Sequence, residues 1–259
     1  MRFLLTNDDG IYARGLYALY EELSKEAECL IVAPEVERSA VGHAITLFRP
    51  LMVRQAKRNG RFLGHAVNGT PADCVKIGLK ELSDGPVDLV VSGINLGANV
   101  GTNVIYSGTV SAATEGAIMG VPAMAVSLDS RRQDADFSFA ARIARKMALF
   151  MLKDNPDRHV PINVNVPDVP EAEIQGIAVT RQGRARLIET FEKRVDPREN
   201  VYYWLAGEIQ VAGREEPDCD SYALSRNMVS ITPIYYDLTR HDILDSLTRS
   251  IRSRFPKPS

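Results

Sequence analysis

Short apolar segments alternate with helix-like segments along the first 167 residues of the chain. The apolar segments are five to eight residues long and apolar on both faces, which is typical of strands buried in a parallel sheet. The intervening segments repeat apolar residues at helical spacing, such as Leu16, Leu19 and Leu23. The pattern predicts an α/β fold, with a mainly parallel sheet and helices on both of its faces. The expected strands are 2–6, 29–34, 87–93, 121–127 and 160–167, and the expected helices are 13–26, 109–119 and 137–152.

Two regions depart from this alternation. Residues 44–67 contain strand-like segments around Asn59-Gly60, a dipeptide typical of tight hairpin turns. After Pro167 the pattern becomes irregular, and we expect antiparallel strands there, followed by an amphipathic helix at about 238–253. We therefore expect a core at 1–167, with a hairpin insertion at about 44–67, and a C-terminal extension at 168–259.

Charge and cysteine content restrict the class of protein. The 259 residues carry a formal net charge of -2, so the chain has no bulk attraction for duplex nucleic acid or an anionic membrane. Cys29, Cys74 and Cys219 form no C-x-x-C pair, which argues against disulfides or a thiolate zinc site and favours a reducing compartment. The N-terminus does not resemble a signal peptide, and no apolar stretch approaches the ~20 residues of a membrane helix. We expect a cytoplasmic protein.

Three polar, glycine-containing segments follow expected strands. They are NDDG at 7–10, PEVERSAVGH at 34–43 and SGINLGANVGTNVIYSGT at 92–109. Because ligands bind beyond the carboxyl ends of the strands in an open parallel sheet, we expect the three loops to face one crevice. His43 ends the second of these segments, and its role stays open.

Asp8 and Asp9 stand side by side at the end of the first expected strand. Adjacent carboxylates repel each other, so they are stable together either in water or around a cation. A turn released by Gly10 lets both side chains point the same way, and two carboxylates suit Mg²⁺ or Mn²⁺. A solvated turn or helix cap is the alternative, and for these residues in isolation it is the better interpretation.

The third loop is uncharged and rich in glycine. Its Asn95 and Asn99 can offer amide oxygens and donors to a ligand. Ser107, Gly108 and Thr109 then precede an expected helix, where hydroxyl and N–H groups form an anion site. A simple N-cap at Thr109 is the alternative. A cation site and an anion site at one crevice indicate a phosphate substrate.

Seven segments, taken in order, resemble the SurE family of metal-dependent nucleotidases, also called stationary-phase survival proteins. They extend from residue 4 to about 241 and read LLTNDDGIYARG, APEVERSAVGHAIT, VNGTPADCV, SGINLGANVG, YSGTVSAATEG, INVNVP and SITPIYYDLT. The resemblance implies a Rossmann-like catalytic core and hydrolysis of nucleoside 5′- and 3′-monophosphates, and of short polyphosphate by some members. It also implies a homodimer or homotetramer that assembles through the C-terminal extension.

The resemblance further assigns site residues. It implies one divalent metal ion per subunit, Mg or Mn, bound by Asp8, Asp9, Ser39 and Asn95. The family's phosphate-contacting segment matches Ser107, Gly108 and Thr109. One departure is visible, because Ser111 stands where glycine is expected; the change is small, and we expect no effect on the chemistry.

Two functions are compatible with these residues. The first is a metal-dependent phosphatase for nucleoside monophosphates, in which Asn99 contacts the substrate and Asp8 or Asp9 orients the attacking water or accepts its proton. A covalent phospho-aspartate at Asp8 is a competing mechanism. The second function is a nucleotide-binding regulatory module without turnover. In either case the aromatic segment 201–207 and the terminal helix pack on the chain's own core or, as the resemblance favours, against another subunit.

Overall fold

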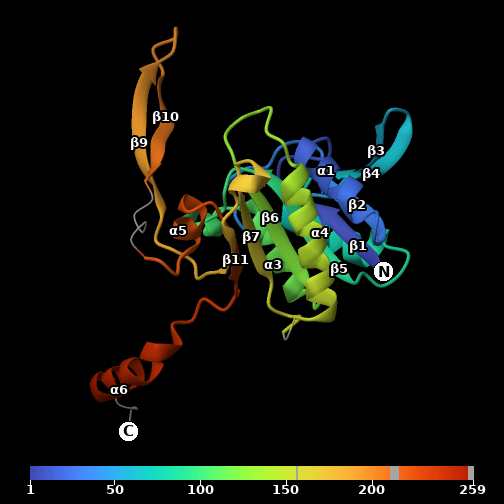
Figure 1. Cartoon of the computed structure of the whole chain (residues 1–259). Helices are drawn as coiled ribbons and strands as arrows, with labels where there is room; N and C mark the ends of the chain where they lie inside the picture. The colour runs from blue at the N-terminus through green and yellow to red at the C-terminus, as the bar shows by residue number, and fades with distance from the viewer. Residues whose placement is uncertain (156, 211–215, 256–259) are drawn as a thin grey trace.

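The computed structural model describes residues 1–155, 157–210 and 216–255; the parts of the expected C-terminal extension at 211–215 and 256–259 lie outside the described residues. Its centre is a nine-stranded sheet in the order β3-β4-β2-β1-β5-β6-β7-β11-β8, with helices on both faces (Figure 1). The strands are β1 (Arg2–Thr6), β2 (Glu28–Pro34), β3 (Val53–Arg58), β4 (Arg61–Val67), β5 (Leu89–Leu96), β6 (Ala123–Asp129), β7 (Ile162–Pro167), β8 (Gly176–Val179), β9 (Arg186–Val195), β10 (Val201–Gln210) and β11 (Met228–Pro233). The α-helices are α1 (Arg14–Leu23), α2 (Pro71–Ile77), α3 (Gly108–Ile118), α4 (Ser138–Lys153), α5 (Asp220–Ser225) and α6 (Leu244–Arg254).

The central strands run parallel. β1 pairs in parallel with β2 and β5, and the parallel pairing continues through β4 on one side and through β6 and β7 on the other. Helices α1, α3 and α4 each lie in the chain between two of these parallel strands, as crossover connections. The structure thus confirms the α/β, Rossmann-like fold expected from the alternating pattern, with each of the five expected strands within two residues of its expected start.

Each central strand buries side chains on both faces of the sheet. In β1, Phe3 and Leu5 belong to the apolar cluster that includes α1 and α4, whereas Leu4 belongs to the cluster that includes α2 and α3. All three side chains are 0% exposed. Burying a side chain of this size contributes about 1.5–3 kcal/mol. β1 is therefore held firmly at the centre of the sheet, and so is the start of the loop that follows it.

The expected hairpin forms at Asn59 and Gly60. Their φ angles of 51° and 77° lie in the left-handed region that a two-residue hairpin turn needs. Its strands, β3 and β4, begin only at Val53, and residues 44–52 form a loop instead. Because β4 also pairs in parallel with β2, the hairpin becomes one edge of the main sheet.

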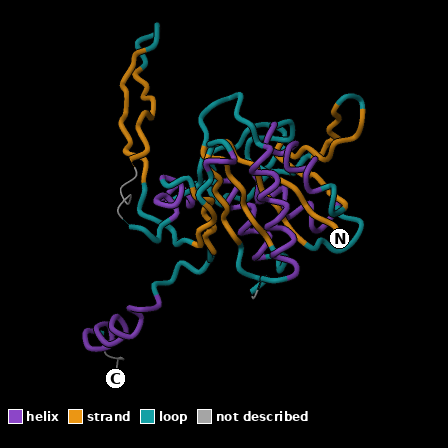
Figure 2. Tube along the Cα trace, viewed as in Figure 1, coloured by secondary structure: helices purple, strands orange, loops and turns teal. Residues whose placement is uncertain are grey.

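The region after Pro167 contributes to the same sheet. β11 pairs antiparallel with β7, as expected for this region, whereas β8 pairs in parallel with β11. The sheet therefore continues past residue 167, and the division into 1–167 and 168–259 stays a prediction. β9 and β10 form a separate antiparallel hairpin that projects from the core, and α6 lies away from the sheet (Figures 1 and 2). In the described parts of the chain, no helix has the length and apolar character to span a membrane.

Candidate active site

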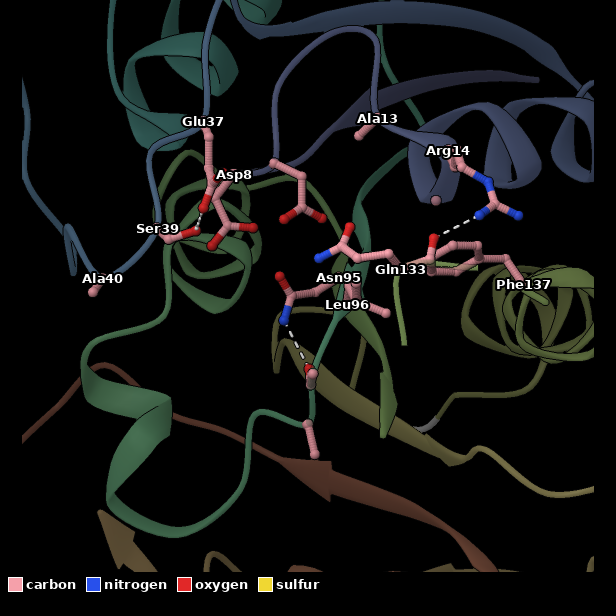
Figure 3. A pocket seen from close by; sticks show the side chains of 14 residues that line it. Asp8, Ala13, Arg14, Glu37, Ser39, Ala40, Asn95, Leu96, Gln133 and Phe137 are labelled. Carbon is pink, nitrogen blue, oxygen red and sulfur yellow. Dashed lines mark hydrogen bonds between the residues drawn. The ribbon is translucent and has the colours of Figure 1, made fainter. Parts of the chain in front are cut away.

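A cavity of about 530 Å³ lies at the edge of the sheet where β1, β2 and β5 end (Figure 3). The loops after these strands meet there, as the position of their polar residues predicted. Residues from all three form its wall, and they include the four predicted metal ligands Asp8, Asp9, Ser39 and Asn95. The remaining wall is formed mainly by Arg14, Glu37, Gln133 and Phe137.

The turn after β1 is shaped by Asn7 and Gly10. The buried Asn7 side chain donates from Nδ2 to the Gly10 carbonyl at 3.0 Å and accepts from the Gly10 N–H at 3.2 Å. Gly10 has a φ of 99°, a conformation that costs glycine little and strains other residues. Asp8 and Asp9 lie within this turn, so both of their side chains reach the cavity wall instead of pointing to opposite faces of the strand.

Asp8 is tied to the start of α3. Its side chain is buried, its Oδ2 accepts from the Thr109 N–H at 3.1 Å, and its Oδ1 accepts from the Thr109 hydroxyl. Burial raises the pKa of the Asp8 carboxyl, and the hydrogen bonds from Thr109 act in the opposite direction. The helix start thus serves an anion, and in this structure that anion is the Asp8 carboxylate.

Ser107 and Gly108 support this contact. The Ser107 Oγ accepts from the N–H three residues later at 3.1 Å, so Ser107 is the N-cap of α3 and the alternative of an N-cap at Thr109 is wrong. Gly108 allows α3 to approach β1 closely, because a Cβ there would lie 2.8 Å from the Asp8 Cβ. All three residues lie behind Asp8, outside the wall of the cavity. Their contact with a substrate phosphate stays a prediction.

Asp9 also has a raised pKa. Its pKa is raised from 3.8 to about 7, chiefly by burial and also by the negative charges of Asp8 and Glu37, while a hydrogen bond from the Leu96 N–H acts in the opposite direction. In the described part of the chain, no Lys, Arg or His forms an ion pair with any of these three acids. Neighbouring carboxyl groups without a protein cation are the environment that an exogenous cation stabilises.

Two neutral oxygen donors face the same space. The Ser39 Oγ donates to Glu37 Oε1 at 2.7 Å. The Asn95 Nδ2 donates to the Gly97 carbonyl at 2.7 Å, which turns the amide oxygen toward the side of the cavity where Asp8 lies (Figure 3). The described residues contain no cluster of three or more His, Cys, Asp and Glu suited to a metal ion. The candidate donor set is therefore two carboxylates and two neutral oxygens, and such a hard-oxygen set fits Mg²⁺ or Mn²⁺.

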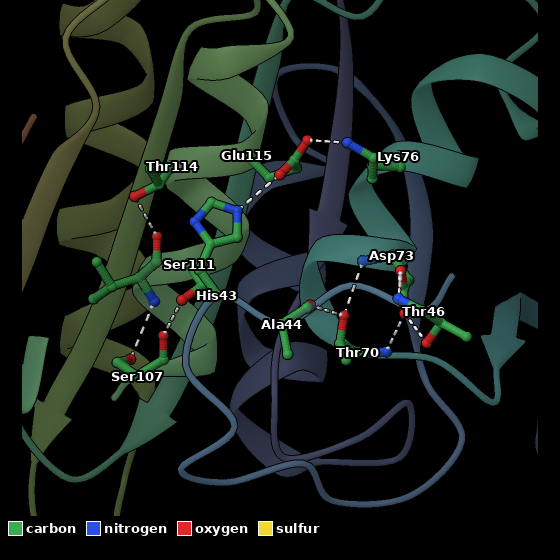
Figure 4. Close-up of polar contacts among 11 residues, drawn as sticks. His43, Ala44, Thr46, Thr70, Asp73, Lys76, Ser107, Ser111, Thr114 and Glu115 are labelled. Carbon is green, nitrogen blue, oxygen red and sulfur yellow. Dashed lines mark hydrogen bonds and ion pairs between the residues drawn. The ribbon is translucent and has the colours of Figure 1, made fainter. Parts of the chain in front are cut away.

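The loop that carries Glu37 and Ser39 is anchored to α2 and α3 (Figure 4). The His43 Nε2 lies 2.7 Å from Glu115 Oε2, and the Lys76 Nζ lies 2.6 Å from the other carboxylate oxygen. The hydrogen bond from His43 is the largest of the interactions that lower the pKa of the buried Glu115. This network gives His43 a structural partner 72 residues away in the chain, and it holds the loop in place on the cavity.

Ser111, the departure from the family pattern, is accommodated within α3. Its hydroxyl donates to the Ser107 carbonyl at 2.7 Å, one turn earlier in the helix (Figure 4). The side chain is buried and satisfied by this bond. It therefore adds no polar group to the cavity, in agreement with the expectation that the change is small.

Asn99 lies in a buried polar network beside the cavity. Its N–H donates to Asn165 Oδ1 at 2.8 Å, and its Nδ2 donates to the Ser127 Oγ at 2.9 Å. Its carbonyl accepts from Asn163 Nδ2 at 2.8 Å. These bonds fix the path of the loop after β5, and a contact between Asn99 and substrate stays a prediction.

Three further residues line the cavity that no motif in the sequence predicted, namely Glu37, Arg14 and Gln133. Glu37 stands two residues before Ser39 in the same polar loop, which is a signal that could have found it. Arg14 donates to the Gln133 carbonyl at 2.7 Å across 119 residues of chain. No local pattern announces that contact, because it depends on α1 packing beside the loop after β6.

Known proteins resemble this chain in sequence and in fold. The family model described as "Survival protein SurE" matches residues 3–189. A protein of Syntrophus aciditrophicus named "5'-nucleotidase SurE" is 71% identical, over 95% of this chain and 92% of its own length. A protein of Syntrophobacter fumaroxidans with the same name is 52% identical, over 95% and 98% respectively. The crystal structure titled as the Sure protein from Aquifex aeolicus is similar with a TM-score of 0.83 and 37% identity, covering 96% of this chain and 99% of that one.

Proposed function

Since the chain belongs to the SurE family, we propose that it is a metal-dependent 5′-nucleotidase, which hydrolyses nucleoside 5′-monophosphates to nucleoside and phosphate. The observation that carries this proposal is the grouping of Asp8, Asp9 and Glu37, with the donors Ser39 and Asn95, at one cavity in the absence of a paired cation among the described residues. The names of relatives that are 71% and 52% identical support the same reaction. Nucleoside 3′-monophosphates and short polyphosphate are further substrates that we propose.

One divalent cation, Mg or Mn, completes the site in this proposal, with Asp8, Asp9, Ser39 and Asn95 as the residues that would hold it. When bound, such an ion polarises phosphoryl oxygens and lowers the pKa of water. The buried Asp8 carboxylate is oriented for this task by Thr109, which bonds both of its oxygens. Ser39 is oriented in turn by its bond to Glu37.

Asp9 is the better candidate for the general base. Thr109 donates to both Asp8 oxygens, and hydrogen bonds to the ionised form make that carboxylate a weaker nucleophile and a weaker base. Asp9 has one backbone donor, from Leu96, and faces the cavity with its remaining lone pairs. We assign to Asp9 the orientation of the attacking water and the acceptance of its proton. The same contacts disfavour a covalent phospho-aspartate at Asp8.

Phosphate release from AMP in the presence of Mg²⁺ or Mn²⁺ tests the proposal. Loss of a general base lowers turnover by about 100-fold or more, so Asp9→Asn is expected to abolish most of the release. Asp84→Asn is the matched control, because Asp84 is exposed and lies before β5, at the opposite end of that strand from Asn95. A nucleotide-binding module without turnover would bind AMP and release no phosphate from it. That outcome, or full activity of Asp9→Asn, would refute the proposal.

The exposed apolar surface of the extension supports a homodimer or homotetramer, which we also propose. Tyr203 and Trp204 on β10 are 58% and 59% exposed, and α6 has no buried residue. The alternative that both segments pack on the chain's own core is therefore wrong for this structure. For the location of the protein we propose the cytoplasm, in keeping with its cysteine pattern.

A further inference from the structure

A second cavity of about 290 Å³ adjoins the first one. The two share Gly97 and Ala98 as wall residues, so a single short loop separates them. The second cavity is lined by residues from the end of β6, from the 3₁₀ turn Gly101–Ile105 and from α5. None of the residues assigned to metal or phosphate lies in it, and the reaction proposed above leaves it without a role.

The order of the strands places the second cavity one step across the sheet from the acids. β1 carries Asp8 and Asp9 at its end, β5 pairs with β1, and β6 pairs with β5, all in parallel. Asp129 is the last residue of β6 and lines the second cavity. Carboxyl ends of neighbouring parallel strands form one continuous binding edge. A ligand held at β1 can therefore extend past the loop of β5 to the end of β6.

The loop between the cavities is held by hydrogen bonds at both of its ends. The Gly97 N–H donates to the Leu128 carbonyl at 2.8 Å. The Gly101 N–H donates to Asp220 Oδ2 at 2.9 Å, and the other oxygen of Asp220 accepts from the Gly183 N–H at 2.9 Å. With Asn99 also bonded on three sides, the partition is built into the fold, and the second cavity is formed before any ligand arrives.

The chemistry of the second cavity differs from that of the first. It has one acid, Asp129, which is exposed to solvent; partial desolvation raises the pKa of its carboxyl, and the positive charge of nearby Arg131 acts in the opposite direction. The rest of its polar wall includes the amide of Asn103 and the hydroxyl of Ser225, and the buried Leu224 supplies an apolar surface. A carboxylate at a strand end is a common acceptor for ribose hydroxyls, while amide and hydroxyl groups can bond the edge of a base.

We propose that this second cavity is the nucleoside subsite, in which Asp129 accepts hydrogen bonds from the ribose hydroxyls and the base lies against Leu224 beside Asn103 and Ser225. The assignment rests on the proposed nucleotidase function, because the phosphate of the same molecule lies in the first cavity. In this assignment the second cavity distinguishes nucleotides from other phosphate monoesters. The loop Gly97–Gly101 then spans the region where the ester joins phosphate to sugar.

Two variants and two substrates test the subsite. Ser225→Trp fills the cavity mouth, and Asp129→Asn removes the charge from the ribose acceptor; both residues are exposed, so folding is expected to persist. Loss of a hydrogen bond to a charged group corresponds to about ten- to hundredfold in kcat/KM. We expect losses of that size with AMP, mainly through KM, and no change with p-nitrophenyl phosphate, which has no nucleoside. Asp129→Asn should also reduce the preference for AMP over its 2′,3′-dideoxy analogue, because its amide oxygen is a weaker acceptor than the carboxylate.

Ser24→Trp is the matched control for the blocking variant. Ser24 and Ser225 are both exposed serines at the end of a helix, and each donates to the carbonyl three residues earlier, at 3.3 and 2.8 Å. The control is expected to behave as the unmodified protein with both substrates. Gln133→Ala probes the other end of the first cavity. If Gln133→Ala selectively weakened AMP hydrolysis and Ser225→Trp did not, the nucleoside would lie in the first cavity beside Gln133, and the assignment would be refuted.

Calorimetric titration with adenosine separates this assignment from the nucleotidase proposal. Adenosine should bind the unmodified protein and bind Ser225→Trp at least about tenfold more weakly, whatever the turnover. Absence of adenosine binding, or equal binding to the variant, would overturn the subsite even if p-nitrophenyl phosphate is hydrolysed. Absence of hydrolysis of either ester, with adenosine binding intact, would overturn the nucleotidase proposal and support the subsite.

Discussion

Replacing Asp9 by Asn should make the metal-free protein more stable at neutral pH while it removes activity. The pKa of Asp9 rises from 3.8 to about 7 in the folded chain, because of burial and the charges of Asp8 and Glu37. Each pH unit between these values costs about 1.4 kcal/mol, so the ionised side chain opposes folding by about 4 kcal/mol at most above pH 7. An amide of the same shape avoids this cost. We expect a higher free energy of unfolding for Asp9→Asn in EDTA at pH 8.

The pH dependence follows from the sign of the shift. Between pH 3.8 and about pH 7 the folded chain binds more protons at Asp9 than the unfolded chain does. The stability that protonated Asp9 contributes is therefore complete below pH 3.8 and is lost as the pH rises through about 7. The difference between Asp9→Asn and the unmodified protein should therefore grow from near zero at pH 4 to its full value at pH 8.

Denaturant unfolding in EDTA at several pH values measures this difference, with Asp84→Asn as control. Repeating it with Mn²⁺ should narrow the difference, because a ligand at 100 times its dissociation constant stabilises the unmodified protein by about 2.7 kcal/mol and the variant by less. A variant that is less stable than the unmodified protein at pH 8 in EDTA, or a difference that does not change with pH, would refute the electrostatic account of the site.

Three further predictions follow from single contacts. Thr109→Val removes the hydroxyl bonded to the buried Asp8; we expect a loss of about 1.5–3 kcal/mol in unfolding free energy and weaker Mn²⁺ binding, and calorimetry that finds unchanged affinity would show that this bond does not orient the ligand. The hydrogen bond from His43 lowers the pKa of Glu115 in the folded chain, so the stability that this carboxylate contributes is complete above pH 4.5 and is lost as the pH falls through the lower pKa of the folded chain. Glu115→Gln should therefore make the free energy of unfolding less dependent on pH in acid, and an unchanged dependence would contradict this. Deleting the residues after Asp237 should shift the oligomer toward monomer or aggregate in light scattering, and a monomeric mass for the intact protein at low micromolar concentration would exclude an oligomer.

Much of the fold could be read from local pattern. β1 is buried on both faces, as its continuous apolar run predicts, and Asn59-Gly60 forms the turn between β3 and β4. Both features follow from side chains within a few residues of each other in the sequence. The same holds for the turn that presents Asp8 and Asp9, which Asn7 and Gly10 close between themselves. The expected meeting of three loops followed from one topological rule, that parallel strands share a carboxyl edge.

The sequence by itself determined which elements form and which oxygen donors stand at strand ends, because hydrophobic period and turn chemistry act over short stretches of chain. Only the tertiary structure decided how those donors are used. Thr109 bonds Asp8 across 101 residues instead of capping its helix, and His43 finds Glu115 across 72. β8 and β11 return from the extension to complete the core sheet. These pairings depend on the order of the strands and on the packing of helices against the sheet. No short segment of sequence encodes that order or that packing, because each contact forms only when segments that are distant in the chain are buried together.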